Sequence, residues 1–313
     1  MAAQNLTGDG EQKALGDVSC SPDLPPGLHG QLTFLSVLNT FMSVTAFLGN
    51  SLILIALHKE SSLHPPSKLL LRSLAITDLC VGLIPQPLAV ICWKSVANGH
   101  RNICRYTSPV GCTTANIFCG VSVSTLTAIS VDRLLALILG LRYKRVVTLK
   151  RTYVIVIILW VFSALFSVIR FWSLSITLLC NIISISLCLI ISIFSYTKIF
   201  FTLRHHQNQV HDHVQLEPNQ TNELNIARYK KAVSTAIWLQ LTLVACYLPY
   251  GVVRALVISG GRSTSVSNAY YYVVSLVYLN SSLNPILYCW KIEEVRQAVK
   301  DTIRQVLGLS SSS

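Results

Sequence analysis

Seven long apolar stretches, separated by polar linkers, dominate the hydrophobic pattern of the chain. They contain no charged residue or histidine apart from Asp78, and they run over residues 31–57, 73–93, 106–131, 152–169, 171–197, 232–253 and 263–290. Each is close to or above the ~20 residues that a helix needs to cross ~30 Å of hydrocarbon. They lack the period-two alternation of transmembrane barrel strands. The pattern predicts an all-α membrane protein, a bundle of seven transmembrane helices.

A different periodicity follows the seventh stretch. Its apolar residues, at intervals of three and four, are Ile292, Val295, Val299, Ile303 and Val306. This spacing predicts a short amphipathic helix on the inner membrane surface. The expected organisation is an extracellular N-terminal tail over residues 1–30, a transmembrane domain over 31–290, and the amphipathic helix with a short cytoplasmic tail over 291–313.

The longest linker, residues 204–228, is polar. It contains four histidines, which are His205, His206, His211 and His213. Such a cluster could hold a metal ion, but no cysteine accompanies it. The alternative is a solvated, mobile loop.

The composition fits a membrane protein. The 313 residues are 52% hydrophobic and 12% charged, with a mean hydropathy of +0.54, which does not describe a soluble surface. The net charge of +12 could indicate nucleic-acid binding, but the basic residues are dispersed between apolar spans, so no nucleic-acid partner is expected. Most of the ten cysteines lie in apolar segments and do not indicate a disulfide framework.

The distribution of positive charge orients the chain. An odd number of spans places the two termini on opposite sides, and with the N-terminus outside, 18 of the 25 lysines and arginines fall at the inner ends. The N-terminus lacks the pattern of a cleavable signal peptide. We expect a multi-pass plasma-membrane protein with an extracellular N-terminus, a cytoplasmic C-terminus and a glycosylation site at Asn5.

Asp78 is the clearest candidate for chemistry, because a charged group in the bilayer interior is costly unless it has a partner. Other spans offer polar residues at similar depth, namely Asn50, Ser122, Asn280, Ser281 and Asn284. Several uncharged oxygens around one carboxylate suit a small hard cation. The alternative is a protonated Asp78 that is hydrogen-bonded within the bundle.

Each span also carries one short motif, in order along the chain. The motifs are Gly49-Asn50, Leu74 to Asp78, Ser130 to Leu134, Trp160, Tyr196, Cys246 to Pro249 and Asn284 to Tyr288. Together they resemble the rhodopsin-like (class A) G-protein-coupled receptors over residues 31–307. The resemblance implies a cell-surface receptor, not an enzyme, that converts binding of an extracellular ligand into activation of a heterotrimeric G protein. Arrestin and membrane lipids are expected as further partners.

The resemblance also assigns roles to residues. In the family, the counterpart of Arg133 turns from its neighbouring acid toward the G protein when the sixth helix swings outward. The expected switch residues are Asp132, Arg133, Tyr196, Tyr247, Pro249, Asn284, Pro285 and Tyr288. The family's sodium-site positions match Asp78, Ser122, Asn280 and Asn284, so a sodium ion is the only cofactor expected.

Several positions depart from the family pattern. Tyr247 replaces the usual tryptophan, and Tyr229 stands where many relatives carry an acid that binds the arginine. The outer turn between the fourth and fifth spans is reduced to about residues 170–173 and has no cysteine, so the family's standard outer disulfide cannot form. The missing disulfide, together with a fifth span that has Cys188 in place of the family's usual proline, resembles the melanocortin, cannabinoid, adenosine and lysophospholipid receptors. We expect Cys104 to pair with Cys20 instead, because both lie on the oxidising side.

The outer half of the spans offers a candidate ligand site. Its residues are Trp93, Asn116, Cys119, Tyr250, Arg254, Tyr271, Ser275 and Tyr278. This mostly apolar and aromatic lining with one cation suits a lipid or peptide that carries an anionic group. The tyrosines could instead form an interfacial aromatic belt. Ala115 stands where amine receptors carry an aspartate, and Tyr278 where opsins carry the retinal lysine, which disfavours both ligand classes.

Two other classes would also explain polar groups inside a membrane. A polytopic transporter or channel predicts internal repeats and helices with matching Gly or Pro breaks, and the sequence shows neither. A membrane enzyme would need a motif such as HExxH or a set of Ser, His and Asp at one depth, and the spans carry none.

Overall fold

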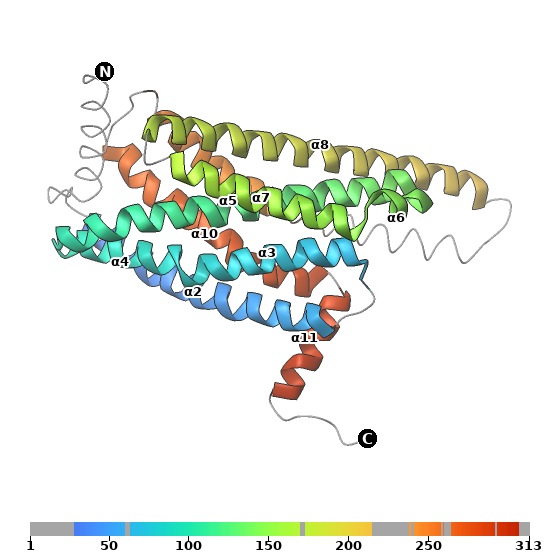
Figure 1. Cartoon of the computed structure of the whole chain (residues 1–313), viewed down its shortest axis with the longest axis horizontal. Helices are drawn as coiled ribbons and strands as arrows, with labels where there is room; N and C mark the ends of the chain where they lie inside the picture. The colour runs from blue at the N-terminus through green and yellow to red at the C-terminus, as the bar shows by residue number, and fades with distance from the viewer. Residues whose placement is uncertain are drawn as a thin grey trace.

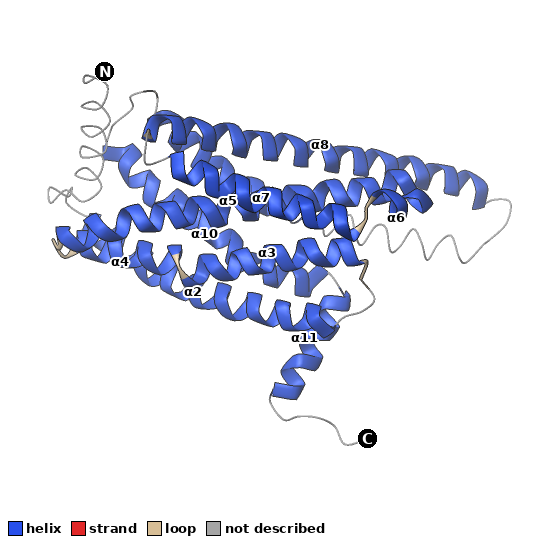
Figure 2. Ribbon diagram, in the orientation of Figure 1, coloured by secondary structure: helices blue, strands red, loops and turns tan. Residues whose placement is uncertain are grey.

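The computed structural model describes residues 28–59, 63–169, 173–214, 238, 241–257, 259, 264–291 and 293–306. Within these residues the chain is almost entirely α-helical and contains no β-strand (Figure 2). The long helices pack side by side along the long axis of the molecule, and the short helix α11 leaves the bundle at an angle (Figure 1). The predicted all-α fold is confirmed.

Each predicted span contains a helix of the structure. The elements are α2 (Leu28–Lys59), α3 (Pro65–Leu83), α4 (Pro85–Ala97), α5 (Arg101–Leu139), η1 (Gly140–Arg142), α6 (Tyr143–Val146), α7 (Leu149–Ile169), α8 (Leu174–Val214), a helix over Leu241–Val257, α10 (Thr264–Lys291) and α11 (Glu293–Val306). Five described stretches are long and apolar enough to cross a membrane, with α3 and α4 counted as one, and Leu241–Val257 is a shorter apolar helix.

The second span is divided between α3 and α4 by a kink at Ile84, which the hydrophobic pattern did not predict. The backbone of Ile84 leaves the helical region, with φ −120° and ψ −74°, and Pro85 opens the next helix. Proline has no N–H to donate, and its ring clashes with the preceding turn. Leu88 N donates to Ile84 O at 3.2 Å, so helical hydrogen bonding resumes directly after the bend.

Helix α5 is the central element, since it packs against α3, α4, α7 and α8. Small residues set the approach of α7. A Cβ atom on Gly120 would lie 3.2 Å from the Ser163 hydroxyl, and Ser167 Oγ donates to Thr113 O at 2.8 Å. Thr152 and Ser167 are the buried residues of α7, and many of its large apolar side chains are exposed on the outside of the bundle.

Two predictions concern the segments that follow the fifth and seventh spans. The predicted mobile loop over residues 204–228 is partly wrong, because α8 continues to Val214 and includes the positions of the four histidines. Residues 215–228 lie outside the described residues. The predicted amphipathic helix is confirmed as α11, whose Val295 and Val299 are buried while Lys300 is exposed.

The outer turn between the fourth and fifth spans is as short as predicted. Helix α7 ends at Ile169 and α8 begins at Leu174. Four residues therefore connect two antiparallel helices, which leaves no room for a folded loop on this side.

Candidate functional site

Asp78 lies fully buried on α3 and is surrounded by neutral hydrogen-bond donors. Its carboxylate accepts bonds from Ser122 Oγ at 2.9 Å, Ser281 Oγ at 2.8 Å and Asn284 Nδ2 at 2.7 Å. Ser122 comes from α5, and the other two come from α10. Among the described residues, no lysine, arginine or histidine forms an ion pair with Asp78. The site therefore joins three helices around a carboxyl group without a cationic side chain.

Several buried oxygen and nitrogen atoms of α2 and α10 have no hydrogen-bond partner within the described part of the chain. They are Asn50 Oδ1, Asn280 Oδ1 and Nδ2, Asn284 Oδ1 and Tyr288 Oη. Asn280 was predicted to share the Asp78 site but makes no hydrogen bond to it, whereas Ser281, which was left out of that set, does. Buried polar atoms are normally satisfied by protein, water or an ion, so this donor and acceptor set fits a small bound cation.

The first-helix and seventh-helix motifs meet beside this site. A Cβ atom on Gly49 would approach the Pro285 ring to 3.0 Å, so only glycine lets α2 and α10 come this close. Pro285 leaves the carbonyl of Ser281 without its helical donor, and Asn50 Nδ2 donates to that oxygen at 3.1 Å. The glycine, the asparagine and the proline thus form one contact.

A second buried carboxylate, Asp132, lies at the opposite end of α5 from Arg101. It is 5% exposed and forms an ion pair of 3.5 Å with Arg133, whose side chain is 35% exposed. Ser67 Oγ donates to it at 2.9 Å, and Tyr143 Oη donates at 2.6 Å. Asp132 therefore keeps two neutral donors that do not depend on Arg133.

The turn after α5 brings Tyr143 within hydrogen-bonding distance of Asp132. Gly140 has a φ of +49°, in the left-handed region that favours glycine, and the chain then forms η1 and α6. Tyr143 also packs against the His64 ring at 5.0 Å. Burial, and next the hydrogen bond to Asp132, raise the pKa of Tyr143 to about 12. The phenol stays protonated and donates at any physiological pH.

Three of the remaining predicted switch residues are buried tyrosines. Tyr196 is buried and accepts a hydrogen bond from Ser130 Oγ at 3.0 Å. Tyr247 is buried and reaches the Cys119 carbonyl at 3.5 Å. Tyr288 is buried with no partner for its hydroxyl among the described residues. Tyr229 lies outside the described residues.

Arg254, a predicted ligand residue, is 9% exposed and lies against two aromatic rings. Its guanidinium lies 5.3 Å from the Tyr250 ring centroid and 5.2 Å from that of Tyr270, and its Nε donates to Tyr250 Oη at 3.0 Å. No carboxylate of the described residues forms an ion pair with it. A buried cation held by two phenol rings can receive an anion.

The other predicted ligand residues fall into separate groups. Trp93 packs edge to face on Tyr271 at 5.8 Å. Asn116 Oδ1 accepts from Asn181 Nδ2 at 3.4 Å, and Tyr278 belongs to the buried core. Ser275 turns toward α2, where it accepts from Asn39 Nδ2 at 2.8 Å. The structure thus groups Arg254 with Tyr250 and places Ser275 in a buried polar contact between helices.

Cys104 is disulfide-bonded. The other cysteines of the described residues are free thiols, so its partner lies outside them. Cys20 also lies outside the described residues, and the pairing of Cys104 with Cys20 stays a prediction. The same holds for glycosylation of Asn5.

Comparison with known proteins identifies the bundle. The chain matches the family described as 7 transmembrane receptor (rhodopsin family) over residues 49–172 and 167–288. The chain belongs to this family. It is a class A G-protein-coupled receptor with a seven-helix bundle, and a receptor rather than an enzyme.

Three relatives illustrate the breadth of the similarity. Trace amine-associated receptor 9 of Homo sapiens is 26% identical, over 92% of this chain and 90% of the relative. Melanocortin receptor 4 of Danio rerio is 25% identical, over 91% and 88%. Adenosine receptor A3 of Canis lupus familiaris is 25% identical, over 86% and 90%. Three differently named receptors at nearly equal identity do not select a ligand class.

Besides Ser281, three residues of the receptor's polar sites were not in the predicted sets. Ser67 and Tyr143 hold Asp132, and Tyr270 stacks on Arg254. Tyr270 carried a weak signal as one of three consecutive tyrosines at the start of the seventh span. Ser67 and Tyr143 carried none, because they are 76 residues apart and meet only through the fold.

Proposed function

We propose that this receptor converts the binding of an extracellular ligand with an anionic group into activation of a heterotrimeric G protein through Arg133. The proposal rests on the partners of Asp132, which are one cation and two neutral hydrogen-bond donors. The carboxylate binds Arg133 on one side and Ser67 and Tyr143 on the other. Arg133 can therefore leave without exposing an unsatisfied buried charge, which would otherwise be costly.

The partly exposed Arg133 is available at the inner surface. A guanidinium presents a planar set of donors that suits backbone carbonyls and carboxylates of a partner protein. Outward movement of the sixth helix would open the path to it, and a partner that binds only this open state shifts the population toward it. Arrestin competes for the same open surface in this proposal.

The anionic group of the ligand is proposed to bind Arg254. The support is the burial of this arginine between Tyr250 and Tyr270 with no acidic partner in the described part of the chain. A ligand carboxylate or phosphate would supply the missing counter-charge. Although one relative is named a trace amine receptor, Ala115 offers no acid to an amine at the position where amine receptors carry one.

We propose that Asp78 holds a sodium ion in the inactive state. Its carboxylate would supply the charge. The hydroxyl oxygens of Ser122 and Ser281, which contact Asp78, and Asn284 Oδ1, which has no partner among the described residues, would supply neutral oxygens. Oxygen ligands and one carboxylate suit a hard monovalent cation. The ion would stabilise the state to which it binds.

The proposed orientation places the N-terminus outside and the amphipathic α11 on the cytoplasmic surface of the plasma membrane. The excess of lysine and arginine at the α6 end of the bundle supports it. Membrane lipids then contact the outward faces of α7 and α8.

The deciding experiment measures cAMP and calcium in cells that express the receptor, against panels of anionic lipids, acidic peptides, nucleosides and amines. An agonist with a carboxylate or phosphate is expected. Its potency should fall by at least about tenfold in Arg254→Gln, while Lys94→Gln, which removes an exposed outer charge, serves as the control. An amine agonist whose potency is unchanged in Arg254→Gln would refute the ligand assignment.

A further inference from the structure

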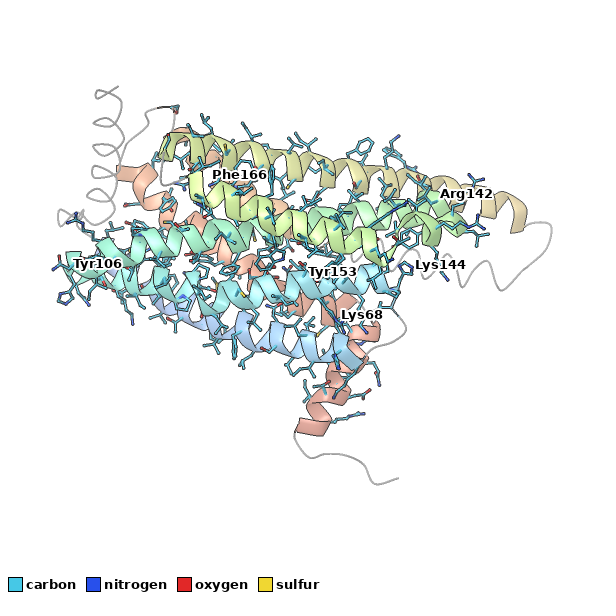
Figure 3. The ribbon with its side chains drawn as sticks, in the orientation of Figure 1. Lys68, Tyr106, Arg142, Lys144, Tyr153 and Phe166 are labelled. Carbon is cyan, nitrogen blue, oxygen red and sulfur yellow. The ribbon has the colours of Figure 1, made fainter. Side chains whose placement is uncertain are left out.

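Two sulfur atoms lie in contact at the end of the bundle that the proposed orientation places outside. The Sγ atoms of Cys92 on α4 and Cys104 on α5 are 3.2 Å apart, and both side chains are buried. Tyr106, two residues after Cys104, lies at the opposite end of the bundle from Arg142 and Lys144 (Figure 3). The sulfur contact is therefore remote from the switch residues, and the proposed sodium site does not use it.

The two sulfur atoms are in different chemical states. Cys104 is disulfide-bonded, whereas Cys92 is a free thiol. The partner of Cys104 lies outside the described residues. A thiol in contact with one sulfur of a disulfide is the arrangement from which thiol–disulfide exchange starts, because the attacking thiolate must reach a sulfur of the bond that breaks.

A tight turn between α4 and α5 fixes the positions of the two cysteines. Gly99 in this turn has a φ of +75°, in the left-handed region that favours glycine. His100 N donates to Ser95 O at 2.8 Å and closes the turn. Cys92 and Cys104 thus face each other across two neighbouring helices. A disulfide bond is only about 1 Å shorter than their present contact, so a bond between them requires little movement of either backbone.

Apolar side chains shield the pair from solvent. The buried residues that cluster with the two cysteines are Leu28, Leu32, Leu35, Trp93 and Val96. A thiol attacks a disulfide as its thiolate, and a thiolate forms where water or a positive charge stabilises it. Disulfide exchange therefore requires a local opening of the outer helix ends, which costs less free energy than global unfolding. When the ends open, Cys92 is already beside Cys104, whereas a dissolved thiol has to diffuse in.

We propose that Cys92 is the exchange partner of the Cys104 disulfide, so that the disulfide at this end of the receptor has two isomers. Cys92 loses its proton to solvent, and its thiolate attacks Cys104 Sγ. The bond between Cys92 and Cys104 forms while the bond between Cys104 and its present partner breaks. The partner sulfur leaves as a thiolate and takes a proton from solvent. One disulfide and one thiol are present before and after the reaction, so disulfide exchange needs no oxidant or reductant.

The two isomers constrain different parts of the receptor. In the first isomer, Cys104 ties α5 to a cysteine beyond the described residues. In the second isomer, the bond joins α4 to α5, two helices that already pack against each other. The bundle can therefore keep its fold while the former partner of Cys104 is released. With Cys20 as the predicted partner, disulfide exchange would free the N-terminal tail from α5.

The test follows both isomers in the purified full-length receptor by mass spectrometry. The receptor is incubated in detergent at about pH 8, where thiols begin to ionise, and no reductant is added. At successive times it is denatured, free thiols are blocked with N-ethylmaleimide, and the unreduced chain is digested with trypsin. Trypsin cuts after Lys94 and Arg101, so the second isomer yields residues 73–94 linked to residues 102–105. The wild type should accumulate this linked peptide while its number of blocked thiols stays constant.

Two variants separate Cys92 from a neighbouring thiol. Cys92→Ala removes the attacking sulfur, so release of the partner of Cys104 should slow by at least about tenfold. Cys112→Ala is the matched control, because Cys112 is a free, partly buried thiol about two turns from Cys104 on α5. This control should form the linked peptide at the wild-type rate. A thermal melt checks that both variants are folded, and Cys92→Ser, which keeps the size of the side chain, replaces Cys92→Ala if that variant is not.

The proposal is overturned if the folded wild type forms no peptide that links Cys92 to Cys104. It is also overturned if the partner of Cys104 is released as fast in Cys92→Ala as in the wild type. A rise in the number of blocked thiols during release would assign the release to reduction and would equally overturn the proposal. Because the peptides are measured without agonist or G protein, the outcome is independent of the proposed signalling function.

Discussion

Two buried carboxylates of this receptor obtain their partners in different ways. Asp132 binds Arg133 and two neutral donors. Among the residues that the structure describes, Asp78 binds neutral donors only, from Ser122, Ser281 and Asn284. The first carboxylate has a counter-charge that belongs to the chain and can move away from it. The second needs a counter-charge from a proton or an ion, so the state of Asp78 can depend on the solution while that of Asp132 depends on the partner protein.

The largest effect is expected from removing the cation beside Asp132. Arg133→Ala should reduce agonist-stimulated nucleotide exchange by about thirtyfold or more, as for the loss of an arginine at the centre of an interface. Surface expression should change little, because Asp132 keeps Ser67 and Tyr143 as donors. Exchange is measured at matched surface levels, with the exposed Arg304→Ala as the control. Normal exchange in Arg133→Ala would contradict the role.

The next effect concerns the other carboxylate. Purified wild-type receptor should melt at a higher temperature in sodium chloride than in choline chloride of equal ionic strength, by several degrees if binding contributes ~2 kcal/mol. Asp78→Asn removes the charge while keeping the size of the side chain, so its melting temperature should not differ between the two salts. A sodium-dependent gain of equal size in both proteins, or in neither, would rule out the site.

Part of the difference between Asp78 and Asp132 could be predicted from the sequence. Apolar length is a local property, so the spans were visible in the hydrophobic pattern, and Asp78 stood out because charge in a span is costly. Ser122 and Asn284 were correctly placed beside it. The contact of Asn280 with Asp78 was not confirmed as a hydrogen bond, because side-chain direction within one helical turn is set by packing.

The rest could not be predicted because it depends on tertiary geometry. The hydrogen bond from Tyr143 to Asp132 requires the turn at Gly140 to fold α6 back toward α3. The kink at Ile84 depends on which neighbours α4 must reach, and the extension of α8 to Val214 lies beyond the apolar span. The hydropathy of the sequence predicts the part of a helix that crosses the bilayer. It does not predict how far the helix continues beyond the bilayer.

Tyr143→Phe sharpens the comparison at Asp132 and should have a smaller effect than Arg133→Ala. When Arg133 leaves, Asp132 would retain Ser67 alone, so agonist-stimulated exchange should fall several-fold, equivalent to ~1 kcal/mol for one hydrogen bond. The folded-state pKa of about 12 lies above the ordinary value, so the hydrogen bond is present below about pH 10 and lost as the pH rises through 12. The deficit should therefore be constant between about pH 6 and 9.

Tyr106→Phe provides the control for that experiment, since Tyr106 is 77% exposed and its hydroxyl has no part in the switch. Equal exchange in wild type and Tyr143→Phe would show that Ser67 suffices for Asp132. A deficit that disappears within the neutral pH range would point to a titrating group other than Tyr143.

The smallest expected effect is a change in the sodium-dependent part of the melting temperature, and it tests whether the helix contact beside Asp78 shapes its site. A Cβ atom on Gly49 would lie 3.0 Å from the Pro285 ring, and a proline ring cannot rotate away as a flexible side chain would. Gly49→Ala should therefore displace α10 by a few tenths of an ångström and destabilise the receptor by about 1 to 3 kcal/mol. Gly251→Ala meets no atom within 4 Å and should be neutral or stabilising, because alanine favours helix.

The informative quantity in Gly49→Ala is the sodium-dependent part of its melting temperature. Ser281 and Asn284 reach Asp78 from α10, and oxygen ligands lose affinity when their geometry is disturbed. The gain in sodium chloride should consequently shrink in Gly49→Ala and remain complete in Gly251→Ala. A lower melting temperature with an unchanged sodium gain would mean that the contact between α2 and α10 supports the fold but does not position the ligands of Asp78.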